Sequence, residues 1–165
     1  MRTTYESPIG PLTLLGDDDG ALTGVLFVNT RYDGDETDDP DALPGARAAL
    51  QRYFDGDPDA FGGLRLRFAG SPLQRAVWHA VLELPFGATT TYGKLAAQLA
   101  ASPRAVGSAN ARTPIPIVMP CHRVIGSDGA LTGYRGGLQI KRALLAFEAS
   151  GGDRDALSGA LRAAA

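Results

Sequence analysis

Three prolines within eight residues constrain this chain more than any other feature of its sequence. The segment TPIPIVMP, residues 113–120, holds Pro114, Pro116 and Pro120 among otherwise mostly apolar side chains. Proline has a fixed φ and no backbone N–H, so this segment can form neither a helix nor a central strand. Its apolar character predicts burial. We therefore expect an extended, buried segment that delivers the residues at 121–123, Cys-His-Arg, to a fixed place.

Helical patterns flank this segment on both sides. Ser71-Pro72-Leu73-Gln74 has the form of a capping box with proline at the first helical position. The side chains that follow at helical spacing are apolar: Leu73, Ala76, Val77, Ala80, Val81 and Leu84. Pro85-Phe86-Gly87 ends this helix. A later apolar pattern predicts another helix over residues 138–149.

Two short helices with a brief turn between them form a helix-turn-helix candidate. Thr91 can cap a helix over residues 92–100, and Ser102-Pro103 opens one from residue 104 to about residue 112. This signal is weak by itself, because helical hairpins are common. The second helix, however, has arginine at both ends, which favours contact with DNA. It would also expose small side chains that permit close approach of a backbone: Gly107, Ser108 and Ala111.

The first part of the chain has the pattern of β structure with one helix. Strand patterns over residues 12–15 and 21–28 flank a hairpin-type turn, and apolar spacing predicts a helix over residues 46–54. Residues 64–68 alternate with period two, which is typical of a half-buried strand. The loop over residues 33–44 is acidic, and we expect a solvated surface there. No residue pattern in this part indicates chemistry.

These patterns predict an α+β fold with a boundary near Ala69-Gly70. Residues 1–70 would form a small β-sheet with a helix. Residues 71–150 would form a mostly helical, winged-helix-like helix-turn-helix domain that carries the cysteine. Residues 151–165 are small and polar, and we expect a flexible tail that frays.

The net charge of −2 conceals an opposition between the two parts. Residues 1–70 carry 6 Lys/Arg and 13 Asp/Glu, a balance of −7, whereas residues 71–150 carry 8 and 3, a balance of +5. Such a basic part suggests a polyanionic partner confined to one face, because the acidic part would repel it. Ordinary surface composition explains the same asymmetry about equally well.

Composition also excludes several classes of protein. No apolar run approaches the roughly 18 residues of a membrane span, and the start MRTTYESPIG lacks the apolar region of a secretory signal. The single cysteine excludes an internal disulfide, and with only two histidines a structural zinc site is not expected. We therefore expect a cytoplasmic protein in a reducing compartment, with no membrane partner, metal or cofactor.

The single cysteine has neighbours that suggest reactivity. A lone cysteine is usually an inert, buried hydrophobic residue, but Cys121 is followed by His122 and Arg123. Nearby positive charge lowers the pKa of a thiol, and a base that is oriented by a carboxylate can take its proton. Of the three acids in the basic part, Glu148 is the one we expect behind His122. A purely structural His122–Glu148 ion pair is the alternative.

The string PCHRVIGSDGALTGYRGGLQIKRALLAFE resembles the active-site region of the O6-alkylguanine-DNA alkyltransferases, the methylated-DNA–protein-cysteine methyltransferases. The resemblance extends from about Ser71 to Glu148, and PCHRV with the downstream GY–GGL pattern is highly specific. The preceding part of the chain is of the right type to be the first domain of that family.

This resemblance implies a reaction and a role for each matching residue. Cys121 would accept the alkyl group from O6-alkylguanine, and from O4-alkylthymine, in one irreversible transfer after the base is flipped out of the duplex. His122, backed by Glu148, would take the thiol proton through a water. Tyr92 would give a proton or a hydrogen bond to the departing guanine, which is a poor leaving group as an anion.

The resemblance also implies a base pocket and a DNA-binding surface. The pocket walls would be Val124, Tyr134, Arg135, Pro116 and Met119. Arg104 would enter the base stack in place of the flipped nucleotide, with the helix in the minor groove. The other residues expected to contact DNA are Ala105, Gly107, Ser108, Arg112 and Lys94. Arg112 and Lys94 are candidates for phosphate contacts, and an ordinary solvated charge explains each of them equally well. The protein would act on double-stranded DNA as a monomer.

Two departures from the family pattern affect these expectations. The family usually has asparagine eight residues before the cysteine, where this chain has Thr113, so the link between the helix and the active-site segment should be weaker. The turn before Arg104 is about two residues shorter than the family pattern, so the sequence does not fix the direction in which that side chain points. Three rival readings are an inactive DNA-binding relative, a Cys-His hydrolase and a sequence-specific regulatory module.

Overall fold

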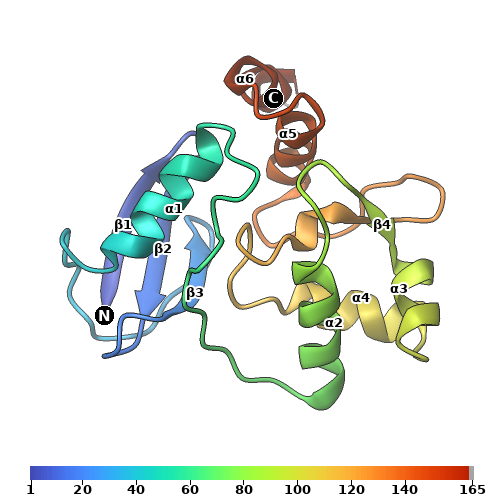
Figure 1. Cartoon of the computed structure of the whole chain (residues 1–165), viewed down its shortest axis with the longest axis horizontal. Helices are drawn as coiled ribbons and strands as arrows, with labels where there is room; N and C mark the ends of the chain where they lie inside the picture. Colours follow the sequence, from blue (N-terminus) through green and yellow to red (C-terminus); the bar gives the residue numbers. More distant parts are fainter. Residues whose placement is uncertain (164–165) are drawn as a thin grey trace.

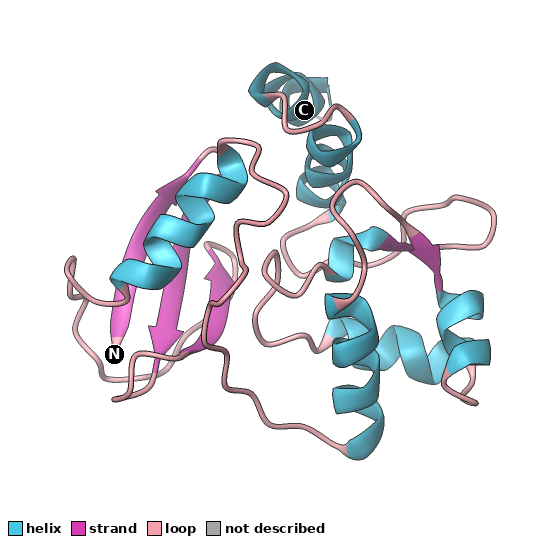
Figure 2. Ribbon diagram, viewed as in Figure 1, coloured by secondary structure: helices cyan, strands magenta, loops and turns pink. Residues whose placement is uncertain are grey.

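The computed structural model describes residues 1–163 and has a β-sheet part followed by a helical part. The sheet is antiparallel with strand order β1-β2-β3, formed by β1 (Arg2–Ser7), β2 (Gly10–Gly16) and β3 (Leu22–Phe27). Helix α1 (Pro44–Phe54) lies across one face of it, as Figures 1 and 2 show. The predicted α+β class is confirmed. Strand β1, which pairs with β2 along its whole length, is not among the strands that the sequence pattern predicts.

Residues 64–68 do not form the strand that their alternation predicts. They make a single isolated bridge, between Leu66 and Leu22 at the edge of β3. Leu22 donates to the carbonyl of Arg65 (2.9 Å) and accepts from the N–H of Arg67 (2.9 Å). A turn at 61–63 comes immediately before this contact, and the extended linker to α2 follows it. The two segments therefore pair at one residue only.

The helical part contains five further helices, a 3-10 turn and a two-stranded ladder. Their bounds are α2 (Pro72–Leu82), β4 (Thr90–Thr91), α3 (Tyr92–Gln98), α4 (Pro103–Ala111), η1 (Cys121–Arg123), β5 (Val124–Ile125), α5 (Leu138–Ala149) and α6 (Arg154–Ala163). The predicted caps are confirmed: the side chains of Ser71, Thr91 and Ser102 each accept a backbone N–H of the helix that they precede. Ser71 and Gln74 complete the capping box.

The turn between α3 and α4 has the hydrogen bonds of a Schellman motif. The N–H of Ala101 donates to the carbonyl of Ala96 (2.9 Å), and Ala100, with φ of 50°, occupies the left-handed position that usually holds glycine. Helix α4 is also fixed from α2, because the indole N–H of Trp78 donates to the carbonyl of Ala109 (2.9 Å). These contacts hold α3 and α4 as a helix-turn-helix pair.

The segment after Gly151 is a helix, contrary to the predicted fraying tail. Helix α6 packs against α5 and buries Leu157 completely. Its start is attached to the end of α1, where Arg154 Nε donates to the carbonyl of Phe54 (2.9 Å). These long-range contacts are invisible in the composition of the segment. Residues 164–165 of the predicted tail lie outside the described residues.

The proline segment is buried, as predicted, but it is not extended, because its residues 117–118 form a turn. Ile115, Ile117 and Met119 have no exposed surface, and the N–H of Met119 donates back to the carbonyl of Ile115 (2.9 Å). Ile117 has φ of 77°, a strained conformation for a β-branched residue. Dense packing around the segment therefore holds a backbone that its own residues would not choose. No helix in residues 1–163 has the length and apolarity to cross a membrane.

Candidate active site

A short parallel ladder brings two distant segments of the site together. Thr90 pairs with Val124 and Thr91 with Ile125. The residue after β4 is Tyr92, and the residues before β5 form the 3-10 turn that begins at Cys121. The ladder therefore places the start of α3 beside the turn that carries the cysteine, although the two are about thirty residues apart in the sequence.

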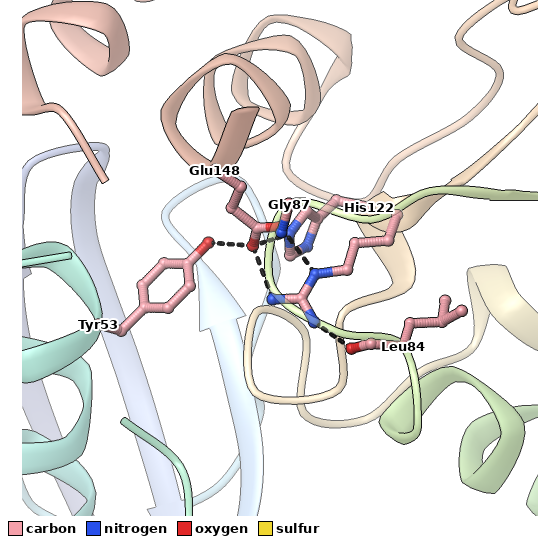
Figure 3. Close-up of polar contacts among 6 residues, drawn as sticks. Tyr53, Leu84, Gly87, His122 and Glu148 are labelled. Carbon is pink, nitrogen blue, oxygen red and sulfur yellow. Dashed lines mark hydrogen bonds and ion pairs between the residues drawn. The ribbon is translucent and has the colours of Figure 1, made fainter. Parts of the chain in front are cut away.

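The carboxylate of Glu148, on α5, is the centre of a buried hydrogen-bond network (Figure 3). Its Oε1 lies 2.7 Å from His122 Nε2 and accepts from Arg123 Nη2 (2.9 Å) and the Tyr53 hydroxyl (2.7 Å). Its Oε2 accepts from Arg123 Nε (2.7 Å) and the N–H of Gly87 (3.1 Å). The predicted contact of Glu148 with His122 is thus present.

Burial and hydrogen bonding together set the charges of this pair. Burial alone would raise the pKa of Glu148, but the donors and charges of His122 and Arg123 outweigh it and hold that pKa well below its usual range. Burial is the main cause that lowers the pKa of His122, and Glu148 opposes it. At neutral pH, therefore, Glu148 is an anion and His122 a neutral ring.

The ionised carboxylate also selects one tautomer of His122. Because an ionised carboxylate can only accept, His122 must donate from Nε2, which leaves the lone pair on Nδ1. Nδ1 is buried and has no hydrogen-bond partner within residues 1–163. His122 can therefore accept a proton at Nδ1 while Glu148 stabilises the resulting imidazolium.

The thiol of Cys121 is protonated in this state, contrary to the expectation from its positive neighbours. Cys121 is only 5% exposed. Burial raises the pKa of its thiol to about 11, and the Thr113 hydroxyl and the charges of Lys141 and Arg135 offset only part of that effect. Arg123, the nearest cation in the sequence, is not among the groups that lower the pKa of the thiol, because its guanidinium is bonded to Glu148.

The cavity next to Cys121 has a volume of about 10 Å³, which is room for about one water. Three of the predicted wall residues line it: Pro116, Tyr134 and Arg135. Val124 and Met119 are buried but do not belong to this lining. The backbone of Val124 is already engaged, since its N–H donates to the Cys121 carbonyl and its own carbonyl accepts from Lys141 Nζ (2.7 Å).

A larger cavity, of about 380 Å³, adjoins the first and includes Tyr92. Both cavities share Ala111 and Gly133 in their linings. The buried ammonium of Lys141 lies 5.8 Å from the centre of the Tyr92 ring. The two cavities therefore meet between α4 and the loop at 132–135.

The residues predicted to bind DNA occur on α3, on α4 and just after α4. Arg104, Ser108, Arg112 and Lys94 are exposed, whereas Ala105 and Gly107 are half-buried. A Cβ on Gly107 would lie 3.7 Å from the Tyr92 ring, an ordinary van der Waals distance, so this part of α4 packs beside Tyr92. No group of three or more His, Cys, Asp or Glu side chains in residues 1–163 could hold a metal ion.

Asn110 makes the link between α4 and the active-site segment that Thr113 was expected to weaken. Asn110 Nδ2 donates to the Cys121 carbonyl (3.2 Å), and the Thr113 hydroxyl donates to the Asn110 carbonyl (2.8 Å). Sequence reasoning missed Asn110, whose polar side chain among small helix residues was the available signal. It also missed Tyr53, because nothing local marks a tyrosine in the first part as a partner of Glu148.

Comparison with known proteins places the chain in a family. Residues 1–68 match the model of the 6-O-methylguanine DNA methyltransferase, ribonuclease-like domain, and residues 72–150 match the model of the DNA binding domain of the same methyltransferase. The chain belongs to the 6-O-methylguanine DNA methyltransferase family.

Individual relatives of this methyltransferase family agree along most of the chain. The methylated-DNA–protein-cysteine methyltransferase of Mycobacterium tuberculosis is 45% identical over 152 residues, which cover 89% of this chain and 91% of the relative. That of Methanosarcina acetivorans is 41% identical, with 88% and 96% covered. The crystal structure of Mycobacterium tuberculosis OGT in complex with DNA superimposes with a TM-score of 0.86 at 42% identity, covering 94% of this chain and 98% of that one.

We predict that Glu148→Gln lowers the free energy of unfolding at pH 7 by about 3–5 kcal/mol, because it leaves the buried Arg123 guanidinium without an anion. The contribution of Glu148 is present above the ordinary glutamate pKa of about 4.3 and is lost as the pH falls towards its lowered pKa. Urea unfolding at several pH values should therefore show the gap to wild type narrowing in acid. Glu83→Gln, at an exposed acid, is the control and should change stability little; a gap that widens in acid would contradict the assignment.

Proposed function

We propose that this methyltransferase repairs double-stranded DNA by moving an alkyl group from O6 of guanine, or from O4 of thymine, to Cys121. The observation that carries the proposal is the buried His122, which lies 2.7 Å from Glu148 and is adjacent in sequence to the buried thiol. Membership of the family supports it. The known relatives are named methylated-DNA–protein-cysteine methyltransferases.

The transfer is an in-line displacement whose protons are handled by this chain. Cys121 Sγ forms a bond to the alkyl carbon as the bond from that carbon to guanine O6 breaks, and the bonding electrons move into the guanine ring. The thiol proton passes to His122 Nδ1 by way of one water. Tyr92 gives a proton to a ring nitrogen of the guanine, and the proton that His122 took from the thiol then returns through solvent to the Tyr92 oxygen. Guanine thus leaves neutral, and the reaction needs no metal or cofactor.

The thiol stays unreactive until a substrate is seated. With a pKa of about 11 it holds its proton at neutral pH, so deprotonation accompanies displacement. The cavity of about 10 Å³ cannot contain a purine. The loop that carries Tyr134 and Arg135 must therefore open, and the base must leave the stack, because its O6 lies at the paired edge of the duplex.

Helix α4 provides the surface for DNA in this proposal. Its exposed Arg104 and Ser108, with Arg112 just after it and Lys94 on α3, would contact the backbone and the minor groove, while Arg104 fills the gap left by the flipped base. The positive balance of residues 71–150 supports an anionic partner. The crystal structure of the Mycobacterium tuberculosis relative in complex with DNA supports DNA as the partner.

The remaining expectations belong to the same proposal. All groups that the displacement uses lie in one chain, which supports action as a monomer. A thiol that must stay reduced is consistent with the cytoplasm. A division into domains at 1–70 and 71–150 is supported by the two family models, whose matches end at residue 68 and begin at residue 72.

The first test is the mass of the intact protein after incubation with an O6-methylguanine duplex. We expect one methyl group per protein, on the peptide that contains Cys121, because a thioether has no bond that water can cleave and the chain has one cysteine. Cys121→Ser should gain no mass. Multiple turnovers per protein would exclude the mechanism and favour the Cys-His hydrolase alternative. Methylation of a different peptide would exclude Cys121 as the acceptor.

The second test concerns Arg104. If its side chain stabilises only the flipped state, Arg104→Ala should slow repair of duplex DNA by roughly ten- to a hundredfold, on the order of 1–3 kcal/mol. The reaction of Cys121 with free O6-benzylguanine, which needs no flipping, should be nearly unchanged. Arg142→Ala, which removes an exposed charge outside α4, is the control. Equal losses on duplex and free base would mean that Arg104 supports the fold instead.

A further inference from the structure

One side chain of the β-sheet part reaches the Glu148 network. Tyr53, near the end of α1, is 1% exposed and its hydroxyl donates to Glu148 Oε1 at 2.7 Å. The same oxygen lies 2.7 Å from His122 Nε2. Figure 3 shows Tyr53 approaching Glu148 from the side opposite His122. Within the described residues, every other donor to Glu148 comes from the helical part.

An aromatic cluster fixes the direction of this hydroxyl. The Tyr53 ring stacks on Phe61 with centroids 5.2 Å apart, and Phe86 and Phe147 meet it edge-on at 5.9 Å and 5.5 Å. Phe86 and Phe147 belong to the helical part, so the ring lies in the junction of the two parts. Phenylalanine would fill the same space. The hydroxyl is the one feature that packing does not explain.

We propose that Tyr53 is a positioning residue for alkyl transfer: its hydroxyl, supplied by the β-sheet part, orients the Glu148 carboxylate and moderates its basicity towards His122. This inference rests on the proposed function, because it assigns His122 as the base. It gives the β-sheet part a defined share in the chemistry of a cysteine in the helical part.

The expected direction of the effect follows from the shared oxygen. Each hydrogen bond to a carboxylate oxygen stabilises the anion and reduces its attraction for a further proton. Without the Tyr53 hydroxyl, Glu148 would hold the imidazolium form of His122 more strongly, and the pKa of His122 would rise. The other ionisable groups that face the pair, which are Arg123, Lys141, Tyr134 and Cys121, would be unchanged.

The test compares Tyr53→Phe with a matched control, Tyr5→Phe. The Tyr5 hydroxyl is also in the β-sheet part and bonds Gln51 on α1 (3.3 Å), but it does not touch the network. The rate of alkylation of each full-length protein by free O6-benzylguanine is measured against pH, together with its thermal midpoint. The free base excludes any effect on DNA binding.

We expect Tyr53→Phe to react roughly three- to tenfold more slowly on the alkaline plateau, since His122 loses part of its fixed orientation. The fall of the rate in acid should begin at a higher pH than in wild type. Tyr5→Phe should keep the wild-type rate and pH profile. A loss of stability alone would move neither the pH at which the rate falls nor the rate per folded molecule.

Two outcomes would overturn the inference. Either Tyr53→Phe keeps the rate and pH profile of wild type, or both variants change alike, which would make the hydroxyl a structural detail. Failure of the proposed function is distinguishable from these, because wild-type protein would then gain no alkyl group on Cys121 from either substrate.

Discussion

The buried carboxylate of Glu148 is the constraint on which the rest of this structure depends. From α5, it accepts hydrogen bonds from three other parts of the fold: from Tyr53 on α1, from the backbone of Gly87, and from the 3-10 turn η1, which contributes His122 and Arg123. Burying an anion and a guanidinium is costly, and hydrogen bonds to both oxygens compensate for it. Burial keeps His122 neutral, and its contact with Glu148 fixes the tautomer that leaves the Nδ1 lone pair available.

A second set of contacts joins the sheet to the other side of the site. The N–H of Val25 donates to the carbonyl of Pro114 (3.0 Å), at the start of the proline segment. Phe27 meets the ring of Tyr134 edge-on at 5.5 Å, and Asn29 Nδ2 donates to the carbonyl of Arg135 (3.3 Å). Strand β3 and the residues after it thus support the wall of the cavity beside Cys121. Helix α1 supports the Glu148 carboxylate, through Tyr53.

Local signals in the sequence predicted local structure well. The caps at Ser71, Thr91 and Ser102 and the helix over residues 138–149 are encoded within a few residues, and so is the burial of the proline segment. The turn within that segment was not predicted. The residue types around Cys121 suggested His122 and Glu148 as its partners, and the family resemblance implied a role for each. Two predictions were wrong because they depended on residues far away in the sequence. Residues 64–68 form one bridge to the edge of β3 instead of a strand. The segment after Gly151 is a helix, α6, because it packs against α5 and the end of α1. The shift of the Cys121 pKa was predicted in the wrong direction. The sequence shows which charged residues are neighbours of Cys121, but it does not show how deeply the thiol is buried.

The charge and tautomer of His122 test this account most directly. The chain has only two histidines, and His79 is exposed, so ¹⁵N NMR of the imidazole rings can be assigned with His122→Asn. We predict that at pH 7 His122 carries its proton on Nε2, with Nδ1 bare, and that the ring stays neutral as the pH falls below 6.5, the ordinary value for histidine. An imidazolium at pH 7, or a neutral ring with its proton on Nδ1, would contradict the claim that Glu148 prepares His122 as the base.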